Sequence, residues 1–135
     1  MALQLSTRLR NAGLDAYETT IGASAILKIR TGPKPANAAA ADSGTVLATV
    51  VLPSDWMAAA SGGSKAKSGT WQDTSADANG TAGHFRIYDS GGATCDMQGT
   101  VTLTGDGGDM TLDNIAFVAG QQFSVTGFTL TAGNA

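Results

Sequence analysis

Several residue types are almost missing from this sequence of 135 residues. It contains one cysteine, three prolines, one histidine and one glutamate, and only 14% of its residues are charged. Cys95 therefore has no partner for an intramolecular disulfide. The longest strongly apolar stretch, Thr45 to Leu52, is far shorter than the roughly 20 residues that a membrane-spanning helix needs. The N-terminus has no apolar run after its charges, so we expect synthesis in the cytoplasm and no membrane partner.

The small amount of charge is mostly negative. The net charge is −3 and the sequence pI is about 4.7, which argues against a nucleic-acid partner because such partners require a basic surface. Residues 1–67 nevertheless carry a net charge of +3 and residues 68–135 a net charge of −6. The two halves are either ordinary solvated surfaces or complementary ends through which copies of the chain meet.

Small residues make up half of the chain. Ala, Gly, Thr and Ser occupy 68 positions, and 23 of the hydrophobic residues are alanines. This composition predicts a thin core built from strands and close turns, and it argues against an all-helical bundle.

The N-terminal region predicts a short helix. Ser6 or Thr7 can cap it, it should run to about Thr20, and Gly22 should end it. Apolar residues recur at helical spacing and form one stripe, consisting of Leu5, Leu9, Ala12, Ala16 and Tyr17. The sequence leaves open whether this stripe packs on its own domain or on a neighbour. We divide the chain into an N-terminal arm and helix, residues 1–22, and a β domain, residues 23–135.

The rest of the chain predicts short strands separated by turns. They are expected near 25–30, 45–52, 70–74, 82–90, 94–104, 110–112 and 115–118, followed by residues 123–130 with a bulge at Gly127. The proline-bearing segment 31–44 is expected to be a loop that covers one sheet edge. The predicted fold is mainly β, an antiparallel β-sandwich or jelly roll with a short N-terminal helix.

Few residues suggest chemistry. Alternation in the 82–90 strand places His84, Arg86 and Tyr88 opposite Phe85, so we expect His84 to face solvent or a partner rather than to act in catalysis. Cys95 falls in the apolar phase of its strand, as a buried small residue would. Asp106, Asp109 and Asp113 form either ordinary turns or a calcium site, although the EF-hand spacing is missing. We therefore expect neither a cofactor nor a metal.

Three segments carry a resemblance: IRTGPKPANAAAADSGTVLATVVLPSDWM, GTWQD and GTAGHFRIYDS. Together with the Thr-alternating C-terminal strands, they resemble small structural virion proteins of tailed bacteriophages, and most of all the capsid cement or decoration proteins with a jelly-roll-like fold. The resemblance implies a protein that is not an enzyme, lies on the capsid surface and binds the major capsid protein or other virion proteins. The alternative is a tail, neck or fibre component, or a lectin-like binding module.

Contacts with such a partner are expected from segments that become ordered on binding, namely residues 1–10 and 31–44. A virion protein of this kind is also expected to be a homo-dimer or homo-trimer, because the thin core leaves apolar surface to cover. Leu5 and Leu9 have an alternative role, which is to close the domain's own core. Trp56 and Trp71 are expected first to pack in the core, next to anchor an interface and last to stack on a sugar ring. The expected partner-binding residues are Leu3, Leu5, Arg8, Leu9, Arg10, Pro33, Pro35, Trp56 and Trp71.

Overall fold

The computed structural model describes residues 3–132 as one helix and ten strands. None of the helical structure in this range is long and apolar enough to cross a membrane. The expectation of a mainly β chain with one short N-terminal helix is confirmed. The elements are α1 (Thr7–Ile21), β1 (Ile26–Thr31), β2 (Val46–Val51), β3 (Ser64–Ala66), β4 (Trp71–Asp73), β5 (Gly80–Tyr88), β6 (Cys95–Leu103), β7 (Met110–Leu112), β8 (Ala116–Phe117), β9 (Phe123–Val125) and β10 (Thr129–Thr131).

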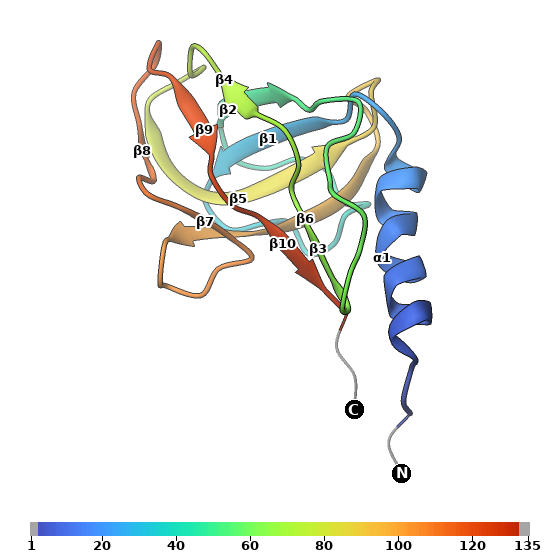
Figure 1. The fold of residues 1–135 in the computed structure, drawn as a ribbon. Coiled ribbons are helices and arrows are strands. Elements are labelled where there is room, and N and C mark those ends of the chain that lie inside the picture. The colour runs from blue at the N-terminus through green and yellow to red at the C-terminus, as the bar shows by residue number, and fades with distance from the viewer. Residues whose placement is uncertain (1–2, 133–135) are drawn as a thin grey trace.

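One curled sheet dominates the fold (Figure 1). Its strand order is β2-β1-β5-β6-β7, and β8 pairs with β5. Every pair in it is antiparallel except β6 with β7, which are parallel. The sheet is therefore mixed, and the expectation of purely antiparallel pairing is wrong at this one pair. Two further sheets have two strands each, β4 with β9 and β3 with β10.

The core lies between one face of the curled sheet and the two small sheets. Phe85 of β5 contacts Phe128 from the C-terminal segment, with ring centroids 5.5 Å apart. Trp71 of β4 contacts the same Phe128 at 5.7 Å and Trp56 at 6.0 Å. These rings fill the space that the many alanines and glycines cannot, so four aromatic side chains form the centre of a thin core.

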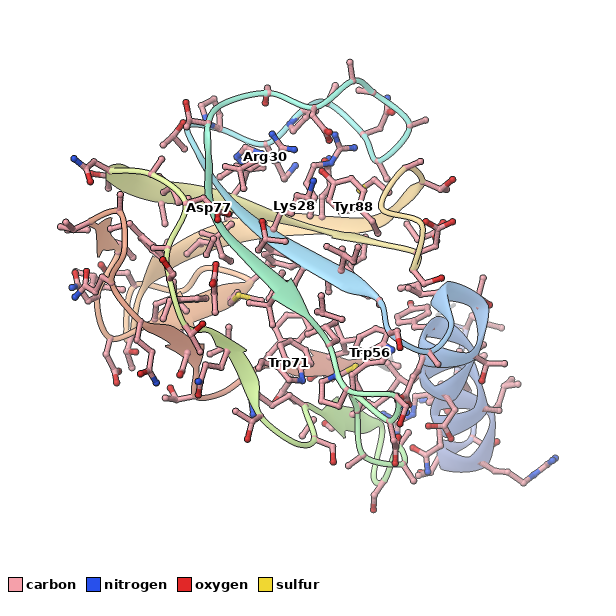
Figure 2. The ribbon with its side chains drawn as sticks, turned by 90° about the horizontal axis from the view of Figure 1, so that it is seen from above. Lys28, Arg30, Trp56, Trp71, Asp77 and Tyr88 are labelled. Atoms are coloured by element: carbon pink, nitrogen blue, oxygen red, sulfur yellow. The ribbon has the colours of Figure 1, made fainter. Side chains whose placement is uncertain are left out.

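The opposite face of the curled sheet is also covered. His84, Arg86 and Tyr88 are each at most 1% exposed, so the expectation that this side of β5 faces solvent is wrong. The segment between β1 and β2, residues 32–45, lies across this face rather than along an edge, as Gln98 of β6 shows by donating to the carbonyl of Pro35 at 2.8 Å. We call residues 32–44 the covering loop. Figure 2 shows Lys28, Arg30 and Tyr88 on this side of β1 and β5, away from Trp56 and Trp71.

A β-bulge changes the side on which Cys95 lies. Ile87 pairs with Met97, but the next residue, Tyr88, pairs with Cys95. The extra residue in β6 shifts the alternation by one position. Cys95 consequently shares the face of Arg86 and Tyr88 and is half-buried, so its predicted place in the apolar core is wrong.

The C-terminal segment contains no bulge at Gly127. Phe123–Val125 pairs with β4, whereas Thr129–Thr131 pairs with β3. Residues 126–128 carry the chain from one small sheet to the other, and this crossing changes the alternation. Phe123 and Phe128 are both buried as expected, but a change of sheet rather than a bulge places them there.

Candidate functional site

Helix α1 begins and ends where the sequence predicts. Ser6 is the N-cap, and its Oγ accepts a hydrogen bond from the amide of Leu9 at 3.1 Å. Gly22 ends the helix with a positive φ of 94°, a conformation that glycine adopts without a side-chain penalty. These local signals fix the length of α1 but not the side that it turns towards the β domain.

The helix faces the β domain with polar residues. Asn11, Asp15 and Glu18 accept hydrogen bonds from the backbone amides of Gly63, Ala60 and Met57, each at 2.9 Å. Only Leu14 and Ile21 of α1 are buried. These amides belong to the segment just before β3. They would lack acceptors without these side chains. The side of α1 that meets the β domain is therefore opposite to the predicted apolar stripe.

A buried lysine completes this contact. Lys65 of β3 is 2% exposed, and its Nζ lies 2.7 Å from Asp15 Oδ1 and 3.2 Å from Glu18 Oε1. Burial alone would lower the pKa of Lys65, but its hydrogen bonds to Asp15 and Glu18 outweigh burial and raise the pKa above its usual value. The hydrogen bond from Lys65, followed by that from the Ala60 amide, lowers the pKa of Asp15. Asp15 and Lys65 are therefore charged at neutral pH. We call Asp15, Glu18 and Lys65 the helix attachment.

The apolar side of α1 faces solvent as a result. Leu9 is 54% exposed and Tyr17 48% exposed, and Ala12 and Ala16 are exposed between them. We call Leu9, Ala12, Gly13, Ala16, Tyr17 and Thr20 the outer stripe. Leu9 does not close the domain's own core, so that alternative is wrong for Leu9, while Leu5 is half-buried.

A groove continues the outer stripe at its C-terminal end. Its volume is about 690 Å³, and its walls come from α1, β6 and β10 and from Ala38 of the covering loop. Tyr17 and Thr20 line one side, and Asp96 and Met97 line the other. The stripe and the groove together form an exposed surface with apolar residues at its centre.

Other expected anchor residues lie around the start of α1. Leu3 is 80% exposed and Arg8 is exposed, as a partner-binding role requires. Arg10 turns back towards the domain instead, because its Nη1 donates to the carbonyl of Ala132 at 3.1 Å. Residues 1–2 of the predicted arm, and residues 133–135 of the predicted β domain, lie outside the described residues.

The two tryptophans are not at the surface. Trp56 and Trp71 are fully buried. Their indole nitrogens donate to the carbonyls of Gly22 and of Trp56 and Ser68, at 3.1 to 3.2 Å. The expectation that they bind a partner is wrong for this structure, and the alternative of core packing holds. Buried indoles need such acceptors because an unpaired N–H in the core is costly.

The covering loop is held onto the sheet by buried arginines. Arg86 donates to the carbonyls of Ala38 and Ala40 at 2.6 to 3.1 Å and to Asp42 at 2.7 Å. Arg30 lies 3.1 Å from the other oxygen of Asp42. We call Asp42, Arg30 and Arg86 the loop attachment. Pro33 is exposed and Pro35 half-buried, within a loop that is already bound to its own domain.

Asp42 also accepts a hydrogen bond from Tyr88 at 2.6 Å. Burial raises the pKa of Asp42, but the hydrogen bond from Tyr88 and the charges of Arg30 and Arg86 together lower it. Burial, and then the hydrogen bond to Asp42, raise the pKa of Tyr88 to about 12. At neutral pH Asp42 is therefore a carboxylate and Tyr88 a neutral phenol.

His84 and Cys95 complete the covered face. His84 Nδ1 donates to the carbonyl of Gly32 at 2.8 Å, and burial lowers the pKa of His84, so the ring is neutral near pH 7. Cys95 Sγ accepts from Arg86 Nε at 3.1 Å and donates to the carbonyl of Met97 at 3.3 Å. The arginine is nine residues away in the sequence, so only the pairing of β5 with β6 brings it to the thiol.

The acidic turn after β6 uses its carboxylates locally. Asp109 accepts hydrogen bonds from the amide and hydroxyl of Thr100 at 2.9 and 3.1 Å, and Asp113 accepts one from Thr104 at 3.2 Å. Within residues 3–132, no three His, Cys, Asp or Glu side chains are placed to hold a metal ion together. Turn formation accounts for Asp109 and Asp113, while Asp106 is exposed.

Sequence reasoning missed the residues of both attachments. Asp42 and Lys65 stand alone in small-residue segments, where nothing indicates burial. One signal for α1 was available, since Asn11, Asp15 and Glu18 follow each other at helical spacing opposite the stripe. The surface formed by Leu3, the outer stripe and the groove is the strongest candidate site for binding a partner. None of the protein-family models, curated proteins or solved structures compared with this chain matches it.

Proposed function

We propose that this chain is a non-enzymatic structural protein of a tailed-bacteriophage virion, a capsid cement or decoration protein that binds the major capsid protein on the capsid surface. The virion assignment rests on the resemblance of the three quoted segments. One structural observation supports a binding role: α1 is attached through its polar side, so Leu3, Leu9 and Tyr17 remain at the surface.

An apolar surface of this kind favours protein binding. Three large hydrophobic residues from one short segment are between 48% and 80% exposed, and hydrophobic residues gathered on one surface typically mark an interaction site. Arg8 is exposed beside them and can pair with a carboxylate at the rim of such a contact. The covering loop contributes less than expected, because its carbonyls and Asp42 are already bound to Arg86.

The structure also gives the charged groups other roles. Lys65 and Arg86 are buried, and each holds a separate segment against the β domain through carboxylates or carbonyls. A group fixed in this way supports the fold rather than a reaction. We therefore propose no catalytic activity for these residues.

The test uses shells that lack this protein and measures how much added protein they bind. Replacing Leu3 with Asp should reduce binding at least about tenfold, because a charge replaces an apolar anchor at the interface. The temperature of unfolding should stay unchanged, since the side chain is 80% exposed. Val118→Asp is the matched control, because Val118 is also exposed, at 57%, but lies in the segment after β8.

Two results would contradict the proposal. One is normal decoration of shells by the Leu3→Asp protein. The other is a count of only a few to tens of copies per virion, which favours the tail, neck or fibre alternative, whereas hundreds of copies favour a shell protein.

A further inference from the structure

The groove beside α1 runs along the edge of a strand rather than over the face of a sheet. Three consecutive residues of β6, namely Asp96, Met97 and Gln98, line it. Consecutive side chains of a strand point to opposite faces of the sheet. Met97 accordingly packs against the core, whereas Gln98 donates to Pro35 on the side of the covering loop. A groove that all three residues line therefore lies beside the edge of β6.

This edge of β6 is open at Gln98. The amide of Thr100 donates to Asp109, which directly precedes β7, so the backbone of Thr100 points away from β5. The backbone of Gln98, two residues earlier, points the same way, because these groups alternate along a strand. β7 begins only opposite Val101, and within residues 3–132 no other strand pairs with this edge. The amide and the carbonyl of Gln98 therefore face the groove without a strand partner.

The other walls of the groove indicate the chemistry of an occupant. Tyr17 and Ile21 of α1 and Leu130 of β10 supply apolar side chains. Asp96 is exposed and takes part in no ion pair within the part of the chain that the structure describes. An extended peptide satisfies an open strand edge through its own backbone, which a helix cannot do because its backbone groups are bonded internally. The walls thus favour an extended segment with apolar side chains and one basic residue.

We propose that an extended segment of the major capsid protein adds to the open edge of β6 as a further strand. A carbonyl of this segment accepts from the amide of Gln98, and an amide of the segment donates to the carbonyl of Gln98. Its apolar side chains contact Met97, Tyr17 and Leu130, and a lysine or arginine pairs with Asp96. The inference rests on the proposed function, because it specifies how the same partner binds at the groove.

The main test is hydrogen–deuterium exchange of the full-length chain, measured free and bound to shells that lack it. The amide of Gln98 should exchange at least about tenfold more slowly on the shells, because it becomes hydrogen-bonded to the added strand. The exposed segment around Val118, after β8, is the internal reference and should keep its rate of exchange.

A proline variant removes the donor that the added strand needs. Gln98→Pro takes away an amide that points away from β5, so the hydrogen bonds between β5 and β6 remain, and proline is tolerated at such edge positions. Gln98→Ala is the matched control, because both variants lose the side-chain bond to Pro35 but only alanine keeps the amide. The proline variant should bind shells at least about tenfold more weakly than the alanine variant. Circular dichroism checks that both variants fold.

A charge reversal tests the basic residue of the occupant. Asp96→Lys should weaken binding to shells about fivefold, because it places a cation against a cation. Asp106→Lys is the matched control, since Asp106 is an exposed carboxylate in the turn after β6 and the change of net charge is the same.

The outcomes separate the added strand from the proposed function. Binding to shells without slower exchange at Gln98 overturns the strand and leaves a capsid protein of another binding mode. Equal binding by Gln98→Pro and Gln98→Ala, or by Asp96→Lys and Asp106→Lys, also overturns it. If the proline variant does not fold, the exchange rate and the charge reversal decide. Failure of the unmodified protein to bind shells overturns both the strand and the proposed function.

Discussion

Two segments outside the sheets, α1 and the covering loop, are held to the β domain by buried charge, but in opposite ways. In the helix attachment, the carboxylates of Asp15 and Glu18 come from the attached segment and meet one cation, Lys65. In the loop attachment, one carboxylate, Asp42, comes from the attached segment and meets two cations of the sheet, Arg30 and Arg86.

This difference determines how well the groups that remain can be hydrated when the cation of an attachment is removed. The Asp15 and Asp42 side chains are 45% and 44% exposed, so each can be hydrated if its cation is lost. The attachments differ in the carbonyls that their cations bind: Lys65 binds that of the exposed residue Ala58, whereas Arg86 binds those of the half-buried residues Ala38 and Ala40. Losing a buried charge is costly mainly because of the partners that it leaves unpaired. The loop attachment should therefore depend on its cation more strongly than the helix attachment.

The largest effect is expected for Arg86→Leu, which breaks the loop attachment at its centre. We expect a loss of about 3 to 5 kcal/mol in the free energy of unfolding, as for other buried charges whose partners remain. Equilibrium unfolding in urea measures it. Lys34→Leu is the matched control, because Lys34 is an exposed cation in the covering loop itself. Equal losses for the two variants would show that Arg86 does not hold the loop.

A smaller effect is expected for Lys65→Met in the helix attachment. We expect a loss of about 2 kcal/mol, because Asp15 can be hydrated and both carboxylates keep their backbone donors, the amides of Ala60 and Met57. The same urea titration measures it. Lys67→Met is the control, since the ammonium of Lys67 donates to the carbonyl of Gly69 at an exposed site. A loss larger than that of Arg86→Leu would reverse the comparison between the attachments.

The smallest effect is the pH dependence of stability that arises from His84, which lies beneath the covering loop. Burial first, then the charges of Arg30 and Arg86, lower the pKa of His84 below 6.5, while the Gly32 carbonyl and Asp42 act in the opposite direction. The unfolded chain therefore takes up a proton before the folded chain does. Stability should fall as the pH decreases below about 6.5, by at most about 1.4 kcal/mol per pH unit, until the folded pKa is reached.

His84→Gln tests the assignment of this pH dependence. His84 is the only histidine, so the slope of stability against pH between about 5 and 6.5 should become nearly flat in the variant. Urea unfolding at several pH values measures the slope. An unchanged slope would mean that another group titrates in this window and that protonation of His84 does not cause the pH dependence of stability.

The sequence predicts those parts of the fold that depend on local signals. The Ser6 cap, the end of α1 at Gly22 and the long strand Cys95–Leu103 are all found where expected. Each depends on residues within one or two turns of helix, or on an unbroken alternation in one strand. Such patterns are local, so the sequence shows them without knowledge of the tertiary contacts.

The errors share a physical cause, which is that the partner surface is not visible in the local pattern. For α1 the sequence left open whether the apolar stripe faces its own domain, because the facing segment, which offers backbone amides and Lys65 to Asp15 and Glu18, is not visible in the local pattern. In β5 both sides are buried, because a loop of small residues covers the polar one. At Cys95, a one-residue shift in pairing places the side chain on the other face of the sheet. No residue type in the sequence indicates this shift.

The two tryptophans give the molecule an optical property that follows from their hydrogen bonds. Both indoles are buried, and that of Trp56 donates to the carbonyl of Gly22 at the end of α1. Detachment of the helix takes away this acceptor and lets water reach the indole, so the fluorescence emission shifts to longer wavelength. Detachment of the covering loop occurs on the opposite side of the sheet, next to Cys95, and leaves the emission unchanged while it exposes the only thiol to alkylation. Fluorescence and thiol labelling thus report on the two attachments separately, without any added probe in the chain.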